Sequence, residues 1–274
     1  MTDLGGQYGV WRRGVDADPQ FAAAVEELGY RSLWLGAVTV DDLDRSHELL
    51  AATTGLIVAT GIVNIWTIRP DVAAAWFHRS HAAYPGRAVL GIGTGHREAQ
   101  GDQAATPYQA LVAYVGALRS AGVPADRIVI AALGPRALKL SRDEAGGTHP
   151  YLTTPEHTRA AREIVGPDRL VVTEQHVKLG DDPAENRRAG REALTFYLKL
   201  TNYRNSWLRQ GFTEADLAGG GSDALVDGLV AQGSAAAVAE RLRAHLKAGA
   251  DQVVIQALGE DPIGDLTALA DELG

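Results

Sequence analysis

The sequence contains no cysteine in 274 residues and has a single methionine. Without cysteine the chain cannot form disulfides, a zinc–thiolate site or a thiol nucleophile. Aromatic residues make up only 6% of the chain, and 26 basic residues stand against 34 acidic ones, which gives a formal net charge of −8. This balance argues against a duplex-DNA-binding protein, because phosphate contacts need a basic surface.

Long hydrophobic runs are also missing. No segment approaches the roughly 18 apolar residues of a membrane span, and the N-terminal MTDLGGQYGVWRR lacks the apolar stretch of a signal peptide. The 46% hydrophobic and 22% charged residues are typical of a globular protein. We therefore expect a cytoplasmic protein that acts on a small molecule, with neither a nucleic-acid nor a membrane partner.

Short apolar runs alternate along the chain with alanine-rich amphipathic stretches. Most runs, such as AVLGIG, RIVIAAL and QVVIQAL, are almost continuously apolar, which is typical of parallel strands covered on both faces. Proline at the first position of several amphipathic stretches, as in Asp18-Pro19 and Pro155-Glu156, marks helix starts. The eight predicted strands cover about residues 8–11, 31–35, 56–60, 88–93, 127–133, 148–152, 170–175 and 252–257.

Eight strands that alternate with helices favour an α/β fold of the (β/α)8 TIM-barrel type, in one domain over residues 1–274. An open doubly wound sheet is the alternative. Residues 178–251 are too many for one crossover and contain at least three helical stretches. We predict a helical insertion there, between the seventh and eighth strands, that forms a lid over the site, a subunit contact or extra packing.

In a barrel, functional residues lie at the carboxyl ends of the strands and in the loops that follow. His96, His149 and Glu174 fall at such positions, but their spacing is not that of metal ligands. His78 and His81 lie one helical turn apart after the third strand, away from these ends, and are read as part of a helix face. We expect no metal site.

Two glycine-containing segments follow predicted strands. GIGTG, at 91–95, is a poor dinucleotide fingerprint because its spacing is GxGxG, but it allows backbone to pass close to a flat ligand. Gly134-Pro135-Arg136 opens the helix after the fifth strand. Exposed N–H groups with an arginine in the first turn make an anion site, and an ordinary capped helix start is the alternative.

The segments ATGIVNIWTIRPDVAAAWFHRSHAAYPGRAVLGIGTGH, AALGPRALKLSRDEAGGTHPYLTTPEHT, TNYRNSWLRQGFTEADLAGGGSDALVDGLV and GADQVVIQAL extend over nearly the whole chain. In this order they resemble the bacterial luciferase-like monooxygenase superfamily, and within it the coenzyme F420-dependent oxidoreductase branch, in a compact actinobacterial-type subgroup. The resemblance implies a TIM barrel that binds a flavin or the deazaflavin F420 at its carboxyl rim.

The resemblance also implies roles for particular residues. A bulge after the third strand would carry a non-prolyl cis peptide at Gly61–Ile62, with a plain glycine turn as the alternative. Cofactor contacts would come from Thr60, Gly61, Ile62, Asn64, Gly93, Thr94, Gly95, Gly134, Pro135 and Arg136. The last three would lie at the cofactor's phosphate. Apart from the resemblance, we expect Trp11 and Trp66 to form walls of an aromatic substrate pocket, with Trp34, inside the second strand, either as a third wall or as part of the core.

The chain departs from many deazaflavin dehydrogenases after its second strand. Those enzymes often carry an Asp-His pair there, whereas this chain has Gly36-Ala37-Val38-Thr39. Of the remaining residues near the strand ends, His96 is best placed to donate or accept a proton, because its ordinary pKa is near neutral. His149 and Glu174 are the other catalytic candidates, and each has a structural role as its alternative.

We therefore predict an F420-dependent oxidoreductase that transfers a hydride between C5 of the deazaflavin and an unidentified small organic substrate. An FMN-dependent monooxygenase or reductase of the same fold is the leading alternative. A flavin- or deazaflavin-binding protein without turnover, and an unrelated barrel enzyme that acts on phosphorylated metabolites, are the others. Members of the family are often dimers, so the resemblance permits a homodimer.

Overall fold

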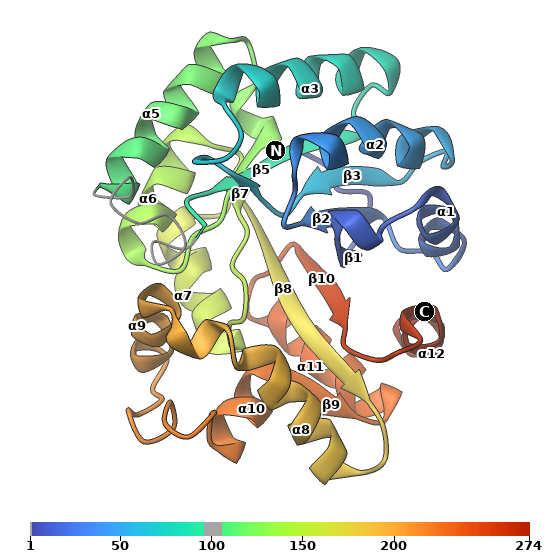
Figure 1. The fold of residues 1–274 in the computed structure, drawn as a ribbon, viewed down its shortest axis with the longest axis vertical. Helices are drawn as coiled ribbons and strands as arrows, with labels where there is room; N and C mark the ends of the chain where they lie inside the picture. The colour runs from blue at the N-terminus through green and yellow to red at the C-terminus, as the bar shows by residue number, and fades with distance from the viewer. Residues whose placement is uncertain (1, 96–105) are drawn as a thin grey trace.

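Residues 2–95 and 106–274 are described by a computed structural model (Figure 1). The strands are β1 (Tyr8–Arg13), β2 (Ser32–Gly36), β3 (Ile57–Thr60), β4 (Val63–Asn64), β5 (Ala88–Gly93), β6 (Ile128–Ile130), β7 (Gly147–Thr148), β8 (Leu170–Leu179), β9 (Val230–Gly233) and β10 (Gln252–Ala257). The α-helices are α1 (Pro19–Glu27), α2 (Val40–Ala51), α3 (Pro70–Ala83), α5 (Pro107–Ser120), α6 (Pro135–Glu144), α7 (Pro155–Val165), α8 (Pro183–Leu194), α9 (Thr201–Arg209), α10 (Asp223–Leu229), α11 (Ala235–Lys247) and α12 (Pro262–Leu273). Short 3₁₀ turns η1 (Gly14–Asp16), η3 (Ala125–Arg127) and η4 (Tyr197–Lys199) connect some of them.

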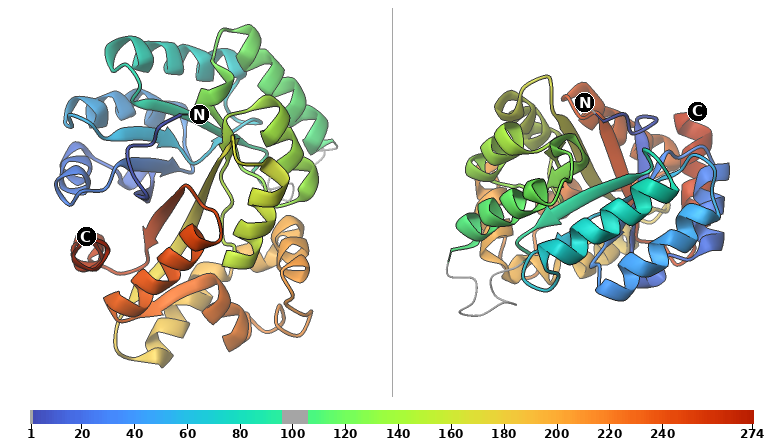
Figure 2. Two further views of the ribbon diagram at one scale, coloured as in Figure 1. Left: turned by 180° about the vertical axis from the view of Figure 1, so that it is seen from behind. Right: turned by 90° about the horizontal axis from the view of Figure 1, so that it is seen from above.

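The sheet closes on itself. From β1 the ring runs through β2, β3, β5, β6, β7 and β8 to β10, which pairs with β1 again, and every pairing is parallel. The predicted eight-stranded α/β barrel is confirmed, and the open sheet is excluded. Figure 2 shows the helices outside the strands, seen from behind and from above.

Local sequence explains why the helices begin where they do. The Asp18 carboxylate caps α1 by accepting a hydrogen bond from the N–H of Phe21, and Pro19 occupies the first turn. Pro135 and Pro155 open α6 and α7 in the same way, as predicted. Each of these helices therefore starts directly after the loop that follows a barrel strand, which places its N-terminus near the carboxyl end of the ring.

Two strands were not predicted. β4 has only two residues and pairs with β5 directly after β3. β9 lies in the segment 178–251, for which the sequence predicts helices only, and pairs outside the ring with the last four residues of β8. Val230 and Ala231 are buried in this pairing. The run is too short to be distinguished from the end of the preceding helix, so it is tertiary contact with β8 that makes it a strand.

The barrel interior is filled by side chains of several strands. Trp34, Ala59, Val129 and Val172 are fully buried and belong to one cluster. A Cβ atom on Gly91 would overlap the carbonyl oxygen of Thr60, so β3 and β5 approach closely there. This packing fills the barrel below the carboxyl ends of its strands. In the described part of the chain, no helix is long and apolar enough to cross a membrane.

Candidate functional site

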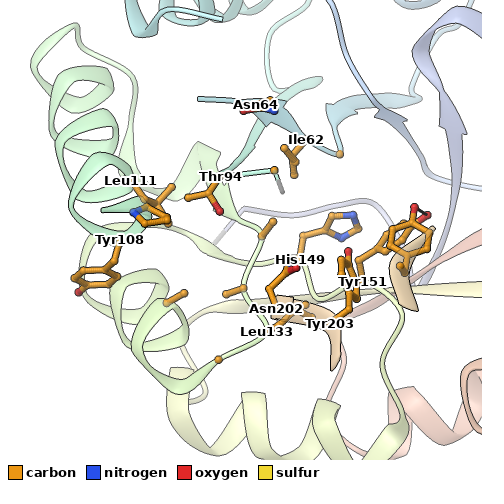
Figure 3. Close-up of a pocket in the computed structure, with 18 of the residues that line it drawn as sticks. Ile62, Asn64, Thr94, Tyr108, Leu111, Leu133, His149, Tyr151, Asn202 and Tyr203 are labelled. Carbon is orange, nitrogen blue, oxygen red and sulfur yellow. Dashed lines mark hydrogen bonds between the residues drawn. The ribbon is translucent and has the colours of Figure 1, made fainter. Parts of the chain in front are cut away.

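A cavity of about 920 Å³ lies at the carboxyl ends of the barrel strands (Figure 3). Residues of β1 and β4 and the loops after β2, β3, β5, β6 and β7 contribute to its lining, and so do α5, α6, η4 and α9. The last two belong to the predicted insertion, which therefore helps to build the site. In Figure 3, Ile62 and Asn64 lie on one side, Tyr151 and Tyr203 on another, and His149 between them.

The segment after β3 forms one wall of the cavity. The peptide bond between Gly61 and Ile62 is cis, which confirms the prediction. The Gly61 carbonyl accepts a hydrogen bond of 2.9 Å from Nε1 of Trp11. A Cβ atom on Gly61 would come within 3.2 Å of that nitrogen and 3.3 Å of Nε2 of His149. The buried rings of Trp11 and His149 thus lie against the backbone at Gly61, and a side chain at this position would fit only if one of the rings moved.

His149 is almost completely buried and stacks on Trp34, with ring centroids 4.6 Å apart. Its Nδ1 lies 2.8 Å from the carbonyl oxygen of Val172. Because a carbonyl only accepts, Nδ1 carries the proton and Nε2 carries a lone pair. Burial lowers the pKa of His149, so the ring is neutral. Within the described residues, Nε2 has no hydrogen-bond partner, and His149 lines the cavity.

Two arginines and a helix start make one end of the cavity cationic. Gly134 is the N-cap of α6 and no side chain caps that helix. Pro135 has no N–H and the N–H of Ala137 donates to the Gly134 carbonyl, so the N–H of Arg136 is the first-turn donor for which no partner is described. The Arg136 guanidinium lies over the ring of Tyr108 at 3.9 Å, and Arg209, from α9, approaches the carbonyl oxygen of Leu133 at 3.4 Å. We call Gly134, Arg136 and Arg209 the cationic end. The helix start was predicted, whereas Arg209 was not.

Aromatic rings line the other end. Tyr151 lies 5.6 Å from Trp11 and 5.5 Å from Tyr197, and Tyr197 lies 4.9 Å from Tyr203 (ring centroids). The Tyr197 hydroxyl donates to that of Tyr151 at 3.0 Å, and the Tyr151 hydroxyl donates to Oε1 of Gln256 at 2.8 Å. We call Trp11, Tyr151, Tyr197 and Tyr203 the aromatic end. The run of aromatic residues in the insertion was the sequence signal for it, but periodicity alone does not show which way that segment faces.

The structure brings most predicted ligand-binding residues to the cavity. The lining contains Trp11, Gly61, Ile62, Asn64, Thr94, Gly95, Gly134, Pro135, Arg136 and His149. Thr60, Gly93 and Trp66 lie behind it. The Thr60 hydroxyl donates to the carbonyl of Gly91, and Nε1 of Trp66 donates to the carbonyl of Thr94. Trp66 thus supports the loop after β5 from outside the cavity lining, and its place at the substrate stays a prediction.

The position of Glu174 in its strand differs from the prediction. Its carboxylate is fully buried, lies 2.6 Å from Nδ1 of His176 and accepts a hydrogen bond of 3.0 Å from the N–H of Leu152. The prediction placed it at a strand end, but β8 continues to Leu179, so Glu174 lies inside the strand and outside the cavity lining. His96, the leading catalytic candidate, lies outside the described residues and stays a prediction. His149 therefore is the catalytic candidate that the structure places in the lining.

The loop after β2 confirms the departure seen in the sequence. Ala37, Val38 and Thr39 line the cavity, and none of them titrates near neutral pH. The Thr39 hydroxyl is engaged as the N-cap of α2, where it accepts from the N–H of Asp42 and contacts its carboxylate. This loop therefore supplies shape to the cavity and no proton-transfer group.

Metal ligation finds no support in the part of the chain that the structure describes. No group of three or more His, Cys, Asp or Glu side chains there is arranged to hold an ion. Nε2 of His78 lies 2.8 Å from the carbonyl oxygen of Ala121 on the neighbouring helix, outside the cavity. The polar groups that do line the cavity suit an organic ligand with an anionic part.

Comparison with known proteins gives the same fold. An F420-dependent secondary alcohol dehydrogenase in complex with an F420–acetone adduct is similar, with a TM-score of 0.73 and 14% identity over 97% of each chain. The F420-dependent tetrahydromethanopterin reductase from Methanopyrus kandleri gives 0.70 and 15% over 98% of each chain. The FMN complex of the oxygenating constituent of 3,6-diketocamphane monooxygenase from Pseudomonas putida gives 0.67 and 12%, again over 98% of each.

Identities this low show a shared fold and nothing finer. No curated protein sequence matches the chain significantly. The family model for luciferase-like monooxygenases, however, matches residues 5–252, which is most of the chain. This match confirms the resemblance seen in the sequence. The protein belongs to the luciferase-like monooxygenase family, whose members are oxidoreductases and monooxygenases.

Proposed function

We propose that the protein is an F420-dependent oxidoreductase that transfers a hydride between C5 of the deazaflavin and a small organic substrate. One observation carries the proposal. The same cavity contains the cationic end, the backbone at Gly61 and Ile62, and Nε2 of His149, a buried acceptor with no hydrogen-bond partner among the described residues. A flat coenzyme with a phosphate-bearing side chain matches both parts. Two similar structures are named as F420-dependent enzymes, which supports F420 over FMN.

The residues present fit such a coenzyme. The cavity, at about 920 Å³, lies near the upper end of the roughly 300–1,000 Å³ typical of ligand pockets, so a coenzyme and a small substrate have room together. In the first turn of α6 the backbone N–H of Arg136 is a donor for a phosphate, and the side chains of Arg136 and Arg209 add positive charge beside it. The backbone at Gly61 and Ile62 allows close approach of a planar ring.

Each part of the site then has a defined task. Arg136 and Arg209 bind the phosphate and so fix the position of the coenzyme. His149 accepts a hydrogen bond at Nε2 from an N–H or O–H group of the bound ligand. The coenzyme itself supplies the carbon that gives or takes the hydride. The protein's contribution is to hold the substrate carbon against that position and to exclude water from it.

The main rival is an FMN-dependent monooxygenase of the same fold, which is favoured by the similar structure that contains FMN. A coenzyme-binding protein without turnover is the other, because the loop after β2 offers no proton-transfer group. Both rivals use the same cavity. They differ from our proposal in which coenzyme binds and in whether a substrate is then converted.

Equilibrium binding separates these readings. F420, reduced F420 and FMN are titrated separately into the purified protein, and binding is followed by fluorescence. We expect micromolar affinity for F420 and much weaker affinity for FMN, and then turnover of at least one compound from a panel of reducible substrates with reduced F420. Preference for FMN would refute the choice of coenzyme. F420 binding without turnover on a broad panel would favour the binding protein.

Substitution of Arg136 tests the cationic end. An arginine–phosphate hydrogen bond contributes about 1.5–3 kcal/mol, so Arg136→Ala should weaken F420 binding by about 10- to 100-fold. Arg142→Ala is the matched control, because Arg142 lies on the same helix, pairs with Asp143 and is outside the cavity lining. Unchanged affinity in Arg136→Ala, or equal losses in both variants, would remove Arg136 from the phosphate site.

A further inference from the structure

We propose that the aromatic end of the cavity is the substrate subsite, and that it selects an uncharged, planar molecule over an anion of the same shape. The inference deepens the proposed function and rests on it, because it assigns the cationic end to the coenzyme's phosphate and leaves the aromatic end for the substrate. In Figure 3, Tyr108, which lies beneath Arg136, and Tyr151 are on opposite sides of the cavity.

Geometry defines the shape of this subsite. Four rings from three parts of the chain meet there: Trp11 from β1, Tyr151 from the loop after β7, and Tyr197 and Tyr203 from the consecutive η4 and α9. Their centroid separations of 4.9–5.6 Å, from Trp11 through Tyr151 and Tyr197 to Tyr203, are those of mutually packed aromatic side chains. A wall of ring surfaces presents apolar faces and edges, which pack best against another planar, largely apolar molecule.

The wall is held in place by its own hydrogen bonds. The side-chain carbonyl of Gln256 only accepts, so the Tyr151 hydroxyl donates to it and in turn accepts from Tyr197. The indole of Trp11 is fixed by its bond to Gly61. Because these rings are positioned before a substrate arrives, little ordering entropy is lost when a rigid planar molecule binds.

Charge decides which planar molecules are accepted. Among the described lining residues none is acidic, and the arginines belong to the cationic end. The Glu174 carboxylate lies behind Tyr151, with His176 and the N–H of Leu152 as its partners. Burial is the main cause of the raised pKa of Tyr151 and of Tyr203, the neighbouring Tyr197 is the next, and the negative charge of Glu174 adds to both.

Burial and the charge of Glu174 act on a bound ligand as they act on these tyrosines. A phenolate in this wall is disfavoured by burial and by the Glu174 charge, and a substrate carboxylate at the same place would meet both effects. An uncharged ligand meets neither. The aromatic end therefore discriminates by charge, and the discrimination has a defined source in Glu174 and in the apolar ring surfaces.

Three probes with the same naphthalene ring test this selectivity on the protein loaded with F420. Calorimetric titrations are made with 2-naphthol, 2-naphthoate and 2-naphthylmethylammonium, which are neutral, anionic and cationic at pH 7. We expect 2-naphthol to bind at least tenfold more tightly than 2-naphthoate and more tightly than the ammonium compound. Equal or tighter binding of 2-naphthoate would overturn the inference, and so would tighter binding of the cation.

Variants locate the effect. Glu174→Gln keeps an acceptor for the N–H of Leu152 and removes the charge, so the ratio of the affinities for 2-naphthol and 2-naphthoate should fall several-fold. Glu163→Gln, at an exposed position, is the control and should leave this ratio unchanged. Tyr197→Leu should weaken 2-naphthol binding at least fivefold. Unchanged ratios in Glu174→Gln, or unchanged binding in a folded Tyr197→Leu, would contradict the assignment. If either variant fails to fold, the three probes on the unaltered protein still decide.

The same samples separate this inference from the proposed function. F420 affinity is measured first, by fluorescence, without any probe. Tight F420 binding with the wrong order of probes overturns the subsite and leaves the coenzyme assignment. The expected order of probes in a protein that does not bind F420 overturns the coenzyme assignment, while the character of the aromatic end stands.

Discussion

Replacing His149 by phenylalanine should separate ligand binding from folding. The change removes the hydrogen bond from Nδ1 to the carbonyl of Val172, which costs about 0.5–1.5 kcal/mol. It also removes a buried acceptor that has no partner among the described residues, which relieves about 1–3 kcal/mol. The phenyl ring keeps the stacking on Trp34. Because the two terms oppose each other, the variant should lie between about 0.5 kcal/mol less stable and about 2.5 kcal/mol more stable than the unaltered protein.

Ligand binding should respond differently. If Nε2 of His149 accepts a hydrogen bond from the coenzyme, its removal should weaken F420 binding by about 5- to 15-fold, which corresponds to about 1–1.5 kcal/mol. The assays are urea unfolding followed by circular dichroism and F420 titration followed by fluorescence. Both assays are needed, because a histidine with only a structural role affects the free energy of unfolding and leaves the F420 affinity unchanged.

His157→Phe is the matched control for this experiment. His157 is also buried, has one ring nitrogen 3.0 Å from the carbonyl of Leu133 and leaves the other without a described partner, but it does not line the cavity. We expect a similar small change in stability and unchanged F420 affinity. A loss of more than about 3 kcal/mol in His149→Phe with unchanged F420 affinity would refute the reasoning, and equal effects of the two variants on binding would do so as well.

Two further predictions concern stability. Burial lowers the pKa of His245 to about 3, whereas in the unfolded chain it is about 6.5, so between these values the unfolded chain binds the proton more readily. The free energy of unfolding should therefore fall by roughly 2 kcal/mol from pH 7 to pH 5 through this residue alone. Urea unfolding at both pH values measures the change, and equal free energies of unfolding would contradict the prediction. Gly91→Ala should destabilise the protein by about 3 kcal/mol or more, because the new methyl group overlaps the Thr60 carbonyl. Gly116→Ala, in α5 with open space around it, should stabilise the protein by about 0.5–1 kcal/mol. Thermal melts measure both changes, and shifts of the same sign would argue against the packing described.

Sequence patterning was sufficient for the barrel. Continuous apolar runs separated by amphipathic stretches predict parallel strands and crossover helices, and the start of α6 at Pro135 followed from the local preference for proline. The helix start at Gly134 to Arg136 could be predicted for the same reason, because it depends on local residues. Features set by neighbouring residues are those that a single sequence predicts best.

Features set by tertiary contact were missed. The sequence predicts the end of β8 near residue 175, but pairing with β9 and β10 extends it to Leu179, and Glu174 consequently lies inside the barrel. Tyr197, Tyr203 and Arg209 reach the cavity only because the insertion folds over the strand ends. Spacing along one helix does not show which face meets the barrel, so these residues could not have been assigned from the sequence.

A crystal structure of the protein grown with F420 tests the central claim most directly. We expect density for the deazaflavin ring in the cavity at the carboxyl ends of the strands, against Gly61 and Ile62, and density for the phosphate at the first turn of α6 beside Arg136. Density for F420 at another site, or a phosphate placed away from α6, would contradict the account.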